Sequence, residues 1–240
     1  MDTVAVAIVC KTPVAGQSKT RLSPPLRAEQ CAALSACFIR DLSNTIQALS
    51  AGDDVVGYAL YAPQGSQALL RPLLPPGFRL LAQGDGDLGA RLTKGAADLF
   101  AAGHVGIVLV NSDAPTLPAT ILREAIDAVR RDSGVVLSPA LDGGYTLIGL
   151  SRLHPGLFAN IPWSTSDVYR ATLDRARELG LAIANVPGWY DVDDVASLQV
   201  LADELSGRPP VCAGHDLIGA DAPATRAFMR MWQTPSTTLD

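Results

Sequence analysis

An aspartate follows a buried strand at a position where it could bind a metal or a substrate. Residues 105–110 form an apolar, largely β-branched run, which is typical of a strand buried on both faces, and Asp113 comes just after it. Open α/β sheets bind their ligands at this carboxyl end of the strands. Because aspartate is also a common turn residue, Asp113 alone leaves a simple turn as an equal alternative.

A second acidic cluster lies near the other end of the chain, at Asp191, Asp193 and Asp194. Asp194 is well placed to cap the following helix, but a cap needs only one carboxylate. In an extended segment Asp191 and Asp193 would project to the same side. Since Mg²⁺ usually takes one or two protein carboxylates, Asp113 and Asp193 are the predicted metal ligands, provided that their two segments are neighbours.

The loop after the first expected strand carries the basic residues Lys11, Lys19 and Arg21, with Gly16 among them. A glycine lets backbone amides approach an anion, and lysine and arginine add charge and hydrogen-bond donors. A solvated basic loop is the alternative. The position of three basic residues between the first strand and the first helix of an α/β sheet favours phosphate binding.

Two other kinds of site are not supported. A nucleotide-binding P-loop needs glycine immediately before its lysine, but Ser18 precedes Lys19, and Pro13 stands where the first glycine would be. No serine-hydrolase elbow or cysteine–histidine pair is recognisable. The remaining cysteines and histidines are interpreted as structural or surface residues, namely Cys10, Cys31, Cys37, Cys212, His104, His154 and His215.

Alternating strands and helices must position these side chains. Strands are predicted at 4–9, 55–61, 78–81, 105–110, 134–138, 145–150 and 181–186. Helices are predicted at 28–49, 64–73, 88–101, 118–130, 166–179 and from 195 to about 205. The strand at 145–150 is expected to pair with 134–138 through an Asp-Gly-Gly turn. The pattern predicts an α/β fold of three layers, with a mostly parallel central sheet and helices on both faces.

Length and composition limit the domain organisation and the partners. The 240 residues predict one domain over 1–206 and an extension over 207–240, which could contact a partner, for example in a homodimer, and whose last residues are expected to be mobile. The net charge of −5 argues against general nucleic-acid or membrane-surface binding. No apolar run is long enough to span a bilayer and no signal peptide is recognisable. Because the four cysteines show no paired spacing and are interpreted as packing residues, a reducing cytoplasm is the expected location.

Six ordered motifs resemble one bacterial family. They are Lys-Thr-Pro-x-x-Gly-x-x-Lys-Thr-Arg-Leu, Gly-Asp-Leu-Gly-x-Arg, Asn-Ser-Asp-x-Pro-Thr-Leu, Asp-Gly-Gly-Tyr-x-Leu-Ile-Gly-Leu, Trp-Ser-Thr and Asp-Val-Asp-Asp. That family has a glycosyltransferase-A-like fold, and its members are described as glycosyltransferases of unknown function. The chain is similar more distantly to phospholactate and molybdenum-cofactor guanylyltransferases. The resemblance implies a nucleotide-diphospho-sugar transferase fold and a divalent metal, Mg²⁺ or Mn²⁺.

The resemblance also assigns roles to residues. It implies that Asp113 and Asp193 bind the metal and that the basic residues of the first loop contact the donor. It places the segment from Gly84 to Arg91 beside the nucleobase, with Asp87 and Gly89 in its turn, and Asp142 near the acceptor. Asp142 could be the base that readies an acceptor hydroxyl, although Asp-Gly-Gly is also an ordinary turn.

Two classes of function remain open from the sequence. The first is a metal-dependent transferase that uses a nucleotide sugar or a nucleoside triphosphate and a small-molecule acceptor, with Lys19 and Arg21 binding phosphate. The second is a non-catalytic nucleotide-binding or regulatory domain of the same fold. The aromatic residues Trp163, Trp189 and Tyr190 could stack on a base or a sugar, but packing is favoured for all three.

Overall fold

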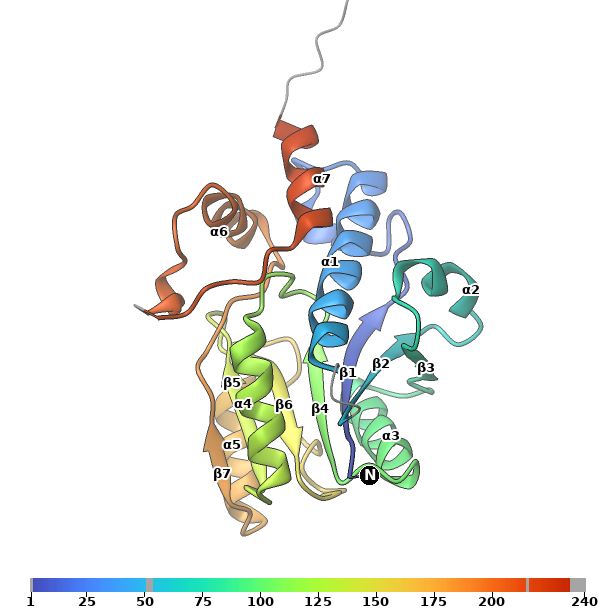
Figure 1. Cartoon of the computed structure of the whole chain (residues 1–240), viewed down its shortest axis with the longest axis vertical. Coiled ribbons are helices and arrows are strands. Elements are labelled where there is room, and N and C mark those ends of the chain that lie inside the picture. Colours follow the sequence, from blue (N-terminus) through green and yellow to red (C-terminus); the bar gives the residue numbers. More distant parts are fainter. Residues whose placement is uncertain (1, 51–53, 215, 234–240) are drawn as a thin grey trace, which may run out of the picture.

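A seven-stranded sheet forms the centre of the molecule in the computed structural model, which describes residues 2–50, 54–214 and 216–233 (Figure 1). The strand order is β3-β2-β1-β4-β6-β5-β7. All neighbouring strands are parallel except β6, which is antiparallel to both β4 and β5. The predicted mostly parallel sheet is therefore confirmed. The strands are β1 (Val4–Lys11), β2 (Val55–Ala62), β3 (Arg79–Ala82), β4 (Gly106–Asn111), β5 (Val135–Pro139), β6 (Tyr145–Leu150) and β7 (Ile183–Asn185).

Helices cover both faces of the sheet, as expected. Because successive residues of a strand point to opposite faces, β1 contributes Val4, Val6 and Ile8 to one apolar core and Ala5 and Ala7 to the other. The first core contains side chains of α1, α4, α6 and α7, and the second contains side chains of α3 and α5. The helices are α1 (Ala28–Leu49), α2 (Gln67–Leu70), α3 (Leu88–Ala101), α4 (Ala119–Arg130), α5 (Val168–Glu178), α6 (Val195–Leu205) and α7 (Pro223–Gln233), with 3-10 turns η1 (Thr20–Leu22), η3 (Arg71–Leu73) and η4 (Val211–Ala213).

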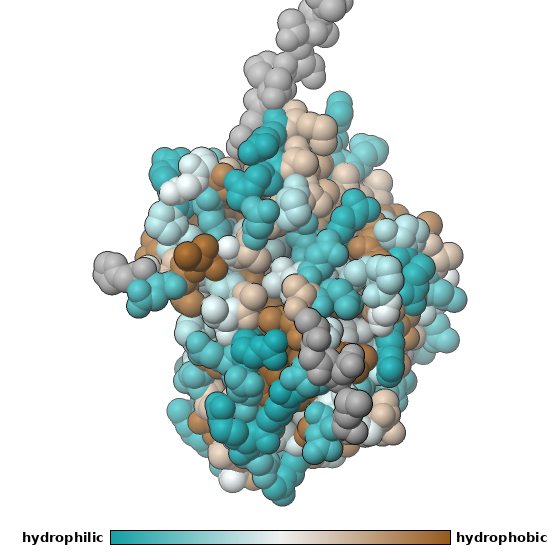
Figure 2. All heavy atoms as spheres, viewed as in Figure 1, coloured by the Kyte–Doolittle hydropathy of each residue, from teal (hydrophilic) through white to brown (hydrophobic). Residues whose placement is uncertain are grey.

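The outer surfaces of the helices are largely polar. In Figure 2, hydrophilic residues are interspersed with smaller hydrophobic areas over the face seen in Figure 1. None of the helices in the described ranges is long and apolar enough to cross a membrane. The apolar stripes thus face the sheet, as amphipathic helices on an α/β core require.

The extent of some elements differs from the sequence prediction. The helix expected at 64–73 divides into α2 and η3, because Pro72 has no backbone N–H to donate to a continuous helix. The strand expected at 181–186 is shorter, because β7 pairs with β5 only from Ile183 to Asn185. The other strands and helices begin and end within three residues of their predicted limits.

Helix α7 was not predicted, and it lies in the segment interpreted as an extension. The carboxylate of Asp41, on α1, accepts hydrogen bonds from the backbone N–H groups of Ala224 (3.0 Å) and Thr225 (2.7 Å). These contacts satisfy donors at the first turn of α7 and dock it on its own chain. The expectation of mobile last residues concerns a segment that lies outside the described residues.

Buried cysteines and a buried histidine agree with their structural interpretation. Cys10, on β1, and Cys31, on α1, both lie in the first apolar core. His104 is buried, and its ring nitrogens are hydrogen-bonded to Thr3 and Tyr58 at 2.8 and 2.9 Å. His215 lies outside the described residues.

Candidate active site

A cavity of about 720 Å³ opens at the carboxyl ends of β1 and β4, where a parallel sheet places its ligand sites. Its walls come from the first loop, the segment after β4, the β5–β6 turn, the segment before α5 and the segment before α6. Segments far apart in the sequence therefore meet here. The predicted site residues that line the cavity are Lys11, Lys19, Arg21, Arg91, Asp113, Asp142 and Asp193.

Four other predicted site residues lie outside the cavity lining. Asp87 caps α3, because its Oδ1 accepts a hydrogen bond from the N–H of Ala90 at 2.8 Å. Gly16 and Gly84 adopt left-handed φ angles of 74° and 79°, which suits a loop and a turn. Gly89 lies at the start of α3, where a Cβ would come within 2.5 Å of the Phe158 carbonyl oxygen. The contacts found for these residues are structural, and their predicted role in nucleotide binding stays a prediction.

Lys19 lies between the two predicted metal ligands. Its Nζ is 2.8 Å from Asp113 Oδ1 and 3.0 Å from Asp193 Oδ1, and it also donates to the backbone carbonyl of Val192. The Lys19 side chain is only 6% exposed. Burial alone would lower the pKa of Lys19, but Asp113 and Asp193 raise it above its ordinary value, so the amine stays protonated. Lys19 thus neutralises the two carboxylates rather than extending freely towards a phosphate.

Backbone contacts hold the two acidic segments side by side. The N–H of Val192 donates to the carbonyl oxygen of Asp113 at 2.8 Å. The side chain of Asn111 accepts from the N–H of Asp113 at 3.2 Å and donates to Asp191 at 3.5 Å. The adjacency on which the predicted pairing of Asp113 and Asp193 depended is therefore present.

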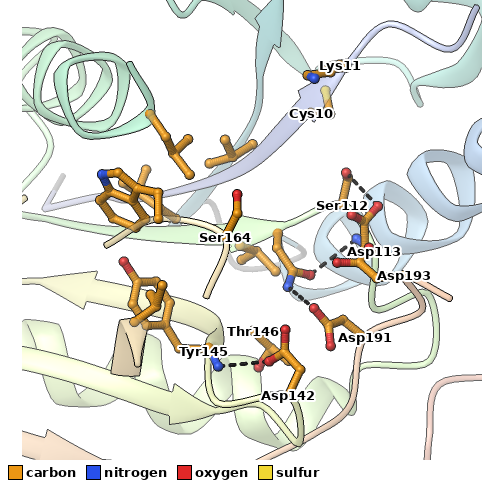
Figure 3. Close-up of a pocket in the computed structure, with 18 of the residues that line it drawn as sticks. Cys10, Lys11, Ser112, Asp113, Asp142, Tyr145, Thr146, Ser164, Asp191 and Asp193 are labelled. Atoms are coloured by element: carbon orange, nitrogen blue, oxygen red, sulfur yellow. Dashed lines mark hydrogen bonds between the residues drawn. The ribbon is translucent and has the colours of Figure 1, made fainter. Parts of the chain in front are cut away.

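Asp191 and Asp142 extend the acidic cluster beyond the predicted pair. One carboxylate oxygen from each of Asp142, Asp191 and Asp193 lies within 4.8 Å of the other two. Figure 3 shows Asp113, Asp191 and Asp193 together on one side of the pocket, with Asp142 next to them. Oxygen donors at this spacing fit a hard divalent cation such as Mg²⁺ or Mn²⁺. Asp191 was not among the predicted ligands, although its alternating spacing with Asp193 was a signal for it.

Burial and the nearby carboxylates make Asp191 a weak acid. Burial, followed by the charges of Asp142 and Asp193, raises the pKa of Asp191 to about 7. A raised pKa means that the native state binds this proton more tightly than the unfolded state does. The contribution of Asp191 to stability therefore falls as the pH rises from about 4 to about 7.

The variant Asp191→Asn is expected to raise the melting temperature of the protein in chelator, because asparagine has no charge to add to the cluster. The gain should be a few degrees at about pH 8, where about 1 kcal/mol corresponds to 2–4 °C, and should nearly vanish at about pH 4, where Asp191 is largely protonated in both the native and the unfolded state. Thermal unfolding at both pH values measures it. An equal shift at the two values would contradict the proposed charge effect.

Asp194 serves the helix rather than the cavity. Its Oδ1 accepts a hydrogen bond from the N–H of Ser197 at 2.8 Å, and the Ser197 hydroxyl in turn accepts from the N–H of Asp194 at 3.0 Å. This reciprocal arrangement is a capping box at the start of α6. The capping role expected for Asp194 is confirmed.

A buried polar network lies behind the acidic cluster. The Trp189 indole N–H donates to the Thr116 hydroxyl, which donates to the Tyr190 hydroxyl, each at 3.2 Å. The Tyr190 hydroxyl donates to Glu204 on α6. Trp189 and Tyr190 are almost fully buried, which confirms the packing interpretation for both. The network joins the segment after Asp113 to the segment before Asp191, so it fixes the distance between the two.

The variant Thr116→Val is expected to lower the free energy of unfolding by about 1–3 kcal/mol, because it keeps the shape but leaves the Trp189 N–H without its acceptor. The midpoint of urea unfolding measures the loss. Thr120→Val is the matched control, since Thr120 is exposed on α4 and should change stability by less than about 0.5 kcal/mol. Equal stability of the two variants would show that the network does not brace the site.

Arg91 is held in the cavity wall by Gln83. The Gln83 amide donates to the carbonyl oxygens of Cys10 (3.1 Å) and Leu60 (2.8 Å), and its Oε1 accepts from Arg91 at 3.2 Å. The guanidinium group therefore has a fixed place beside the end of β1. Trp163 also lines the cavity, whereas the sequence interpretation favoured packing for it. Its ring does pack near Phe158, with centroids 6.5 Å apart.

Comparison with known proteins adds a family and a fold. A family model described as an uncharacterized protein conserved in bacteria (DUF2064) matches residues 43–165, just over half of the chain. No curated protein sequence matches significantly. A structure from Desulfovibrio desulfuricans, provisionally described as a nucleotide-diphospho-sugar transferase, is similar with a TM-score of 0.80 and 27% identity, over 96% of this chain and 95% of that one.

More distant structures share the fold. A cytidylyltransferase from Leptospira borgpetersenii has a TM-score of 0.54 and 12% identity, over 86% of this chain and 87% of that one. Glucosyl-3-phosphoglycerate synthase from Mycobacterium tuberculosis, solved with Mn²⁺ and uridine diphosphate, has a TM-score of 0.50 and 13% identity, over 85% and 77%. This chain therefore has the nucleotide-diphospho-sugar transferase fold, which serves both nucleotidyl and glycosyl transfer.

Proposed function

We propose that this chain, which belongs to the DUF2064 family of bacterial proteins, is a divalent-metal-dependent transferase whose donor is a nucleotide sugar or a nucleoside triphosphate. The observation that carries the proposal is the division of charge within one cavity. Four carboxylates cluster on one side of it (Figure 3), and Lys11, Arg21 and Arg91 lie in the wall formed by β1, the first loop and α3. A nucleotide site needs both acidic and basic residues, because a metal held by the acidic residues and the basic side chains together neutralise the charge of the phosphates.

The acidic residues would hold Mg²⁺ or Mn²⁺. Asp113 and Asp193 are the proposed ligands, with Asp191 and Asp142 close enough to complete the set. Held by these carboxylates, the metal would supply positive charge that offsets the negative charge of the donor phosphates. Lys19 keeps the two proposed ligands together and offsets part of their mutual repulsion.

The remaining charged residues have proposed roles in the transfer step. Lys11, Arg21 and Arg91 would bind the phosphates, and the loop of Gly16 and the segment from Gly84 to Arg91 would border the nucleotide. In nucleotidyl transfer, a phosphate or hydroxyl oxygen of the acceptor would attack phosphorus of the donor and pyrophosphate would leave. In glycosyl transfer, an acceptor oxygen would attack the anomeric carbon and a nucleoside diphosphate would leave. Where the nucleophile is a hydroxyl, Asp142 would take its proton.

Thermal unfolding against a panel of donors tests the proposal. The panel contains nucleoside triphosphates and nucleotide sugars, each with Mg²⁺, Mn²⁺ or chelator. A ligand that binds only the folded protein raises its melting temperature, so at least one donor should give a metal-dependent rise. Nucleotide binding with no metal dependence and no turnover would instead favour a regulatory domain of the same fold.

A further inference from the structure

The two walls of the cavity differ in charge. Every basic residue that lines it comes from the end of β1, the first loop or α3. The opposite wall comes from the β5–β6 turn and from residues 163–168, and its lining contains no basic residue. Its polar and aromatic members are Asp142, Tyr145, Thr146, Trp163, Ser164, Thr165 and Ser166. We call residues 142–146 and 163–166 the neutral wall, because all of them except Asp142 have uncharged side chains.

Close backbone packing makes the neutral wall one unit. Gly143 has a φ of 91°, and a Cβ on it would come within 2.1 Å of the Ser166 carbonyl oxygen. The carbonyl oxygen of Gly143 accepts a hydrogen bond from the N–H of Tyr169 at 2.9 Å. At its far end, the Trp163 Nε1 lies against Gly89 at the start of α3, where a Cβ would be 3.1 Å away. The turn that carries Asp142 is thus fixed relative to Trp163 and Ser164.

Ser164 presents a free hydroxyl to the cavity. Its φ of 65° lies in the left-handed region, which is uncommon for a residue other than glycine and costs free energy. Within the described part of the chain, its side chain makes no hydrogen bond. Figure 3 shows Ser164 in the middle of the pocket, between the Asp142–Tyr145 side and the end of β1 at Cys10 and Lys11. A hydroxyl placed in this way can bond a ligand without losing an internal partner.

The charge balance disfavours an anion at the neutral wall. The neutral wall offers an anion no basic side chain, and a carboxylate oxygen of its Asp142 lies within 4.8 Å of carboxylate oxygens of Asp191 and Asp193. A phosphate or carboxylate placed beside Asp142 would therefore meet like charge with no cation of this wall to offset it. The basic residues on the other wall would already be engaged by the donor phosphates.

We propose that the neutral wall binds an uncharged, polyhydroxylated acceptor, a sugar or polyol, and so selects against phosphorylated acceptors. Ser164 and Asp142 hydrogen-bond its hydroxyls, and the Trp163 ring packs on its C–H face. This inference rests on the proposed transferase function, since it names the acceptor class of the same cavity. The nucleophile of the reaction is then a hydroxyl and not a phosphate.

Saturation-transfer NMR with the full chain, Mg²⁺ and excess pyrophosphate, which engages the basic residues of the other wall without any nucleoside, tests the inference. The probes are glucose, mannose, galactose and glycerol, compared with glucose 6-phosphate, mannose 6-phosphate and glycerol 3-phosphate. At least one neutral probe should bind, and its phosphorylated counterpart should bind at least about tenfold more weakly, as one unfavourable charge contact predicts. The variant Asp142→Asn should reduce the difference in affinity between the neutral probe and its phosphorylated counterpart.

Ser164→Gly is the most informative variant, because glycine accepts the left-handed backbone and removes only the small hydroxymethyl side chain. It should weaken binding of the neutral probe about two- to tenfold without lowering the melting temperature, and Trp163→Phe should weaken binding to a smaller extent. Binding of no neutral probe, equal binding of the phosphorylated probes, or unchanged binding by Ser164→Gly would each overturn the inference. Because nucleotide is left out, these results are independent of the donor panel, and the two proposals can fail separately.

Discussion

Replacing Lys19 by methionine should lower the melting temperature in chelator by about 4–8 °C, which corresponds to about 2 kcal/mol. The substitution removes the ammonium group that neutralises Asp113 and Asp193 and leaves both carboxylates next to each other. The full cost of breaking a buried pair is larger, about 3–5 kcal/mol, but the Asp113 and Asp193 side chains are 30% and 44% exposed, and solvent screens part of it.

Millimolar Mg²⁺ or Mn²⁺ should restore much of this loss, because the cation replaces the missing positive charge. The metal-induced rise in melting temperature is therefore expected to be larger for Lys19→Met than for the natural protein. Lys94→Met is the matched control, since Lys94 pairs with Asp98 on the exposed side of α3 and should change little. If the metal-induced rise in melting temperature disappeared in Lys19→Met, Lys19 would be required for metal binding. The cation would then not be replacing the charge of the missing ammonium group.

Asp193→Asn is expected to reduce turnover by at least about 100-fold with the donor that the panel identifies, because several kcal/mol of transition-state stabilisation depend on the metal. It should also abolish the metal-dependent rise in melting temperature. Release of nucleoside diphosphate or pyrophosphate measures turnover.

Asp194→Asn is the control for this variant. Asp194 is the next residue, but it caps α6, and asparagine is an equally good cap. The control should keep turnover within about twofold of the natural protein. Similar losses in both variants would indicate that α6 had been disturbed, and would leave no support for Asp193 as a ligand.

Local patterns were sufficient to predict most of the sheet and the edge at which the site lies. The apolar run before Asp113 correctly predicted β4, and the amphipathic spacing correctly predicted α1. Such predictions succeed because burial on one or two faces of an element determines where apolar residues recur in the sequence. The carboxyl ends of parallel strands meet at one edge, so Asp113 and Lys19 could be expected near each other before any contact was known.

Features that depend on strand order or distant partners could not be read from the residue order. β6 lies between β4 and β5, and this order brings the turn of Asp142 to the same edge as Asp113. An isolated bridge between Ala140 and Trp189 then brings the segment of Asp191 alongside. The start of α7 is capped by Asp41, a residue more than 180 positions earlier, and no local signal indicates such a cap. The ion pairs of Lys19 could not be predicted from local sequence either, since both of its partners come from distant segments of the chain.

The measurement that tests the central claim most directly is Mn²⁺ binding by electron paramagnetic resonance, with the natural protein, Asp193→Asn and Asp194→Asn. If the acidic cluster is a metal site, the natural protein and Asp194→Asn should each bind about one Mn²⁺ per chain, more tightly when the donor nucleotide is present, and Asp193→Asn should bind far less. Equal Mn²⁺ binding by all three proteins, or none by the natural protein with nucleotide present, would contradict the account.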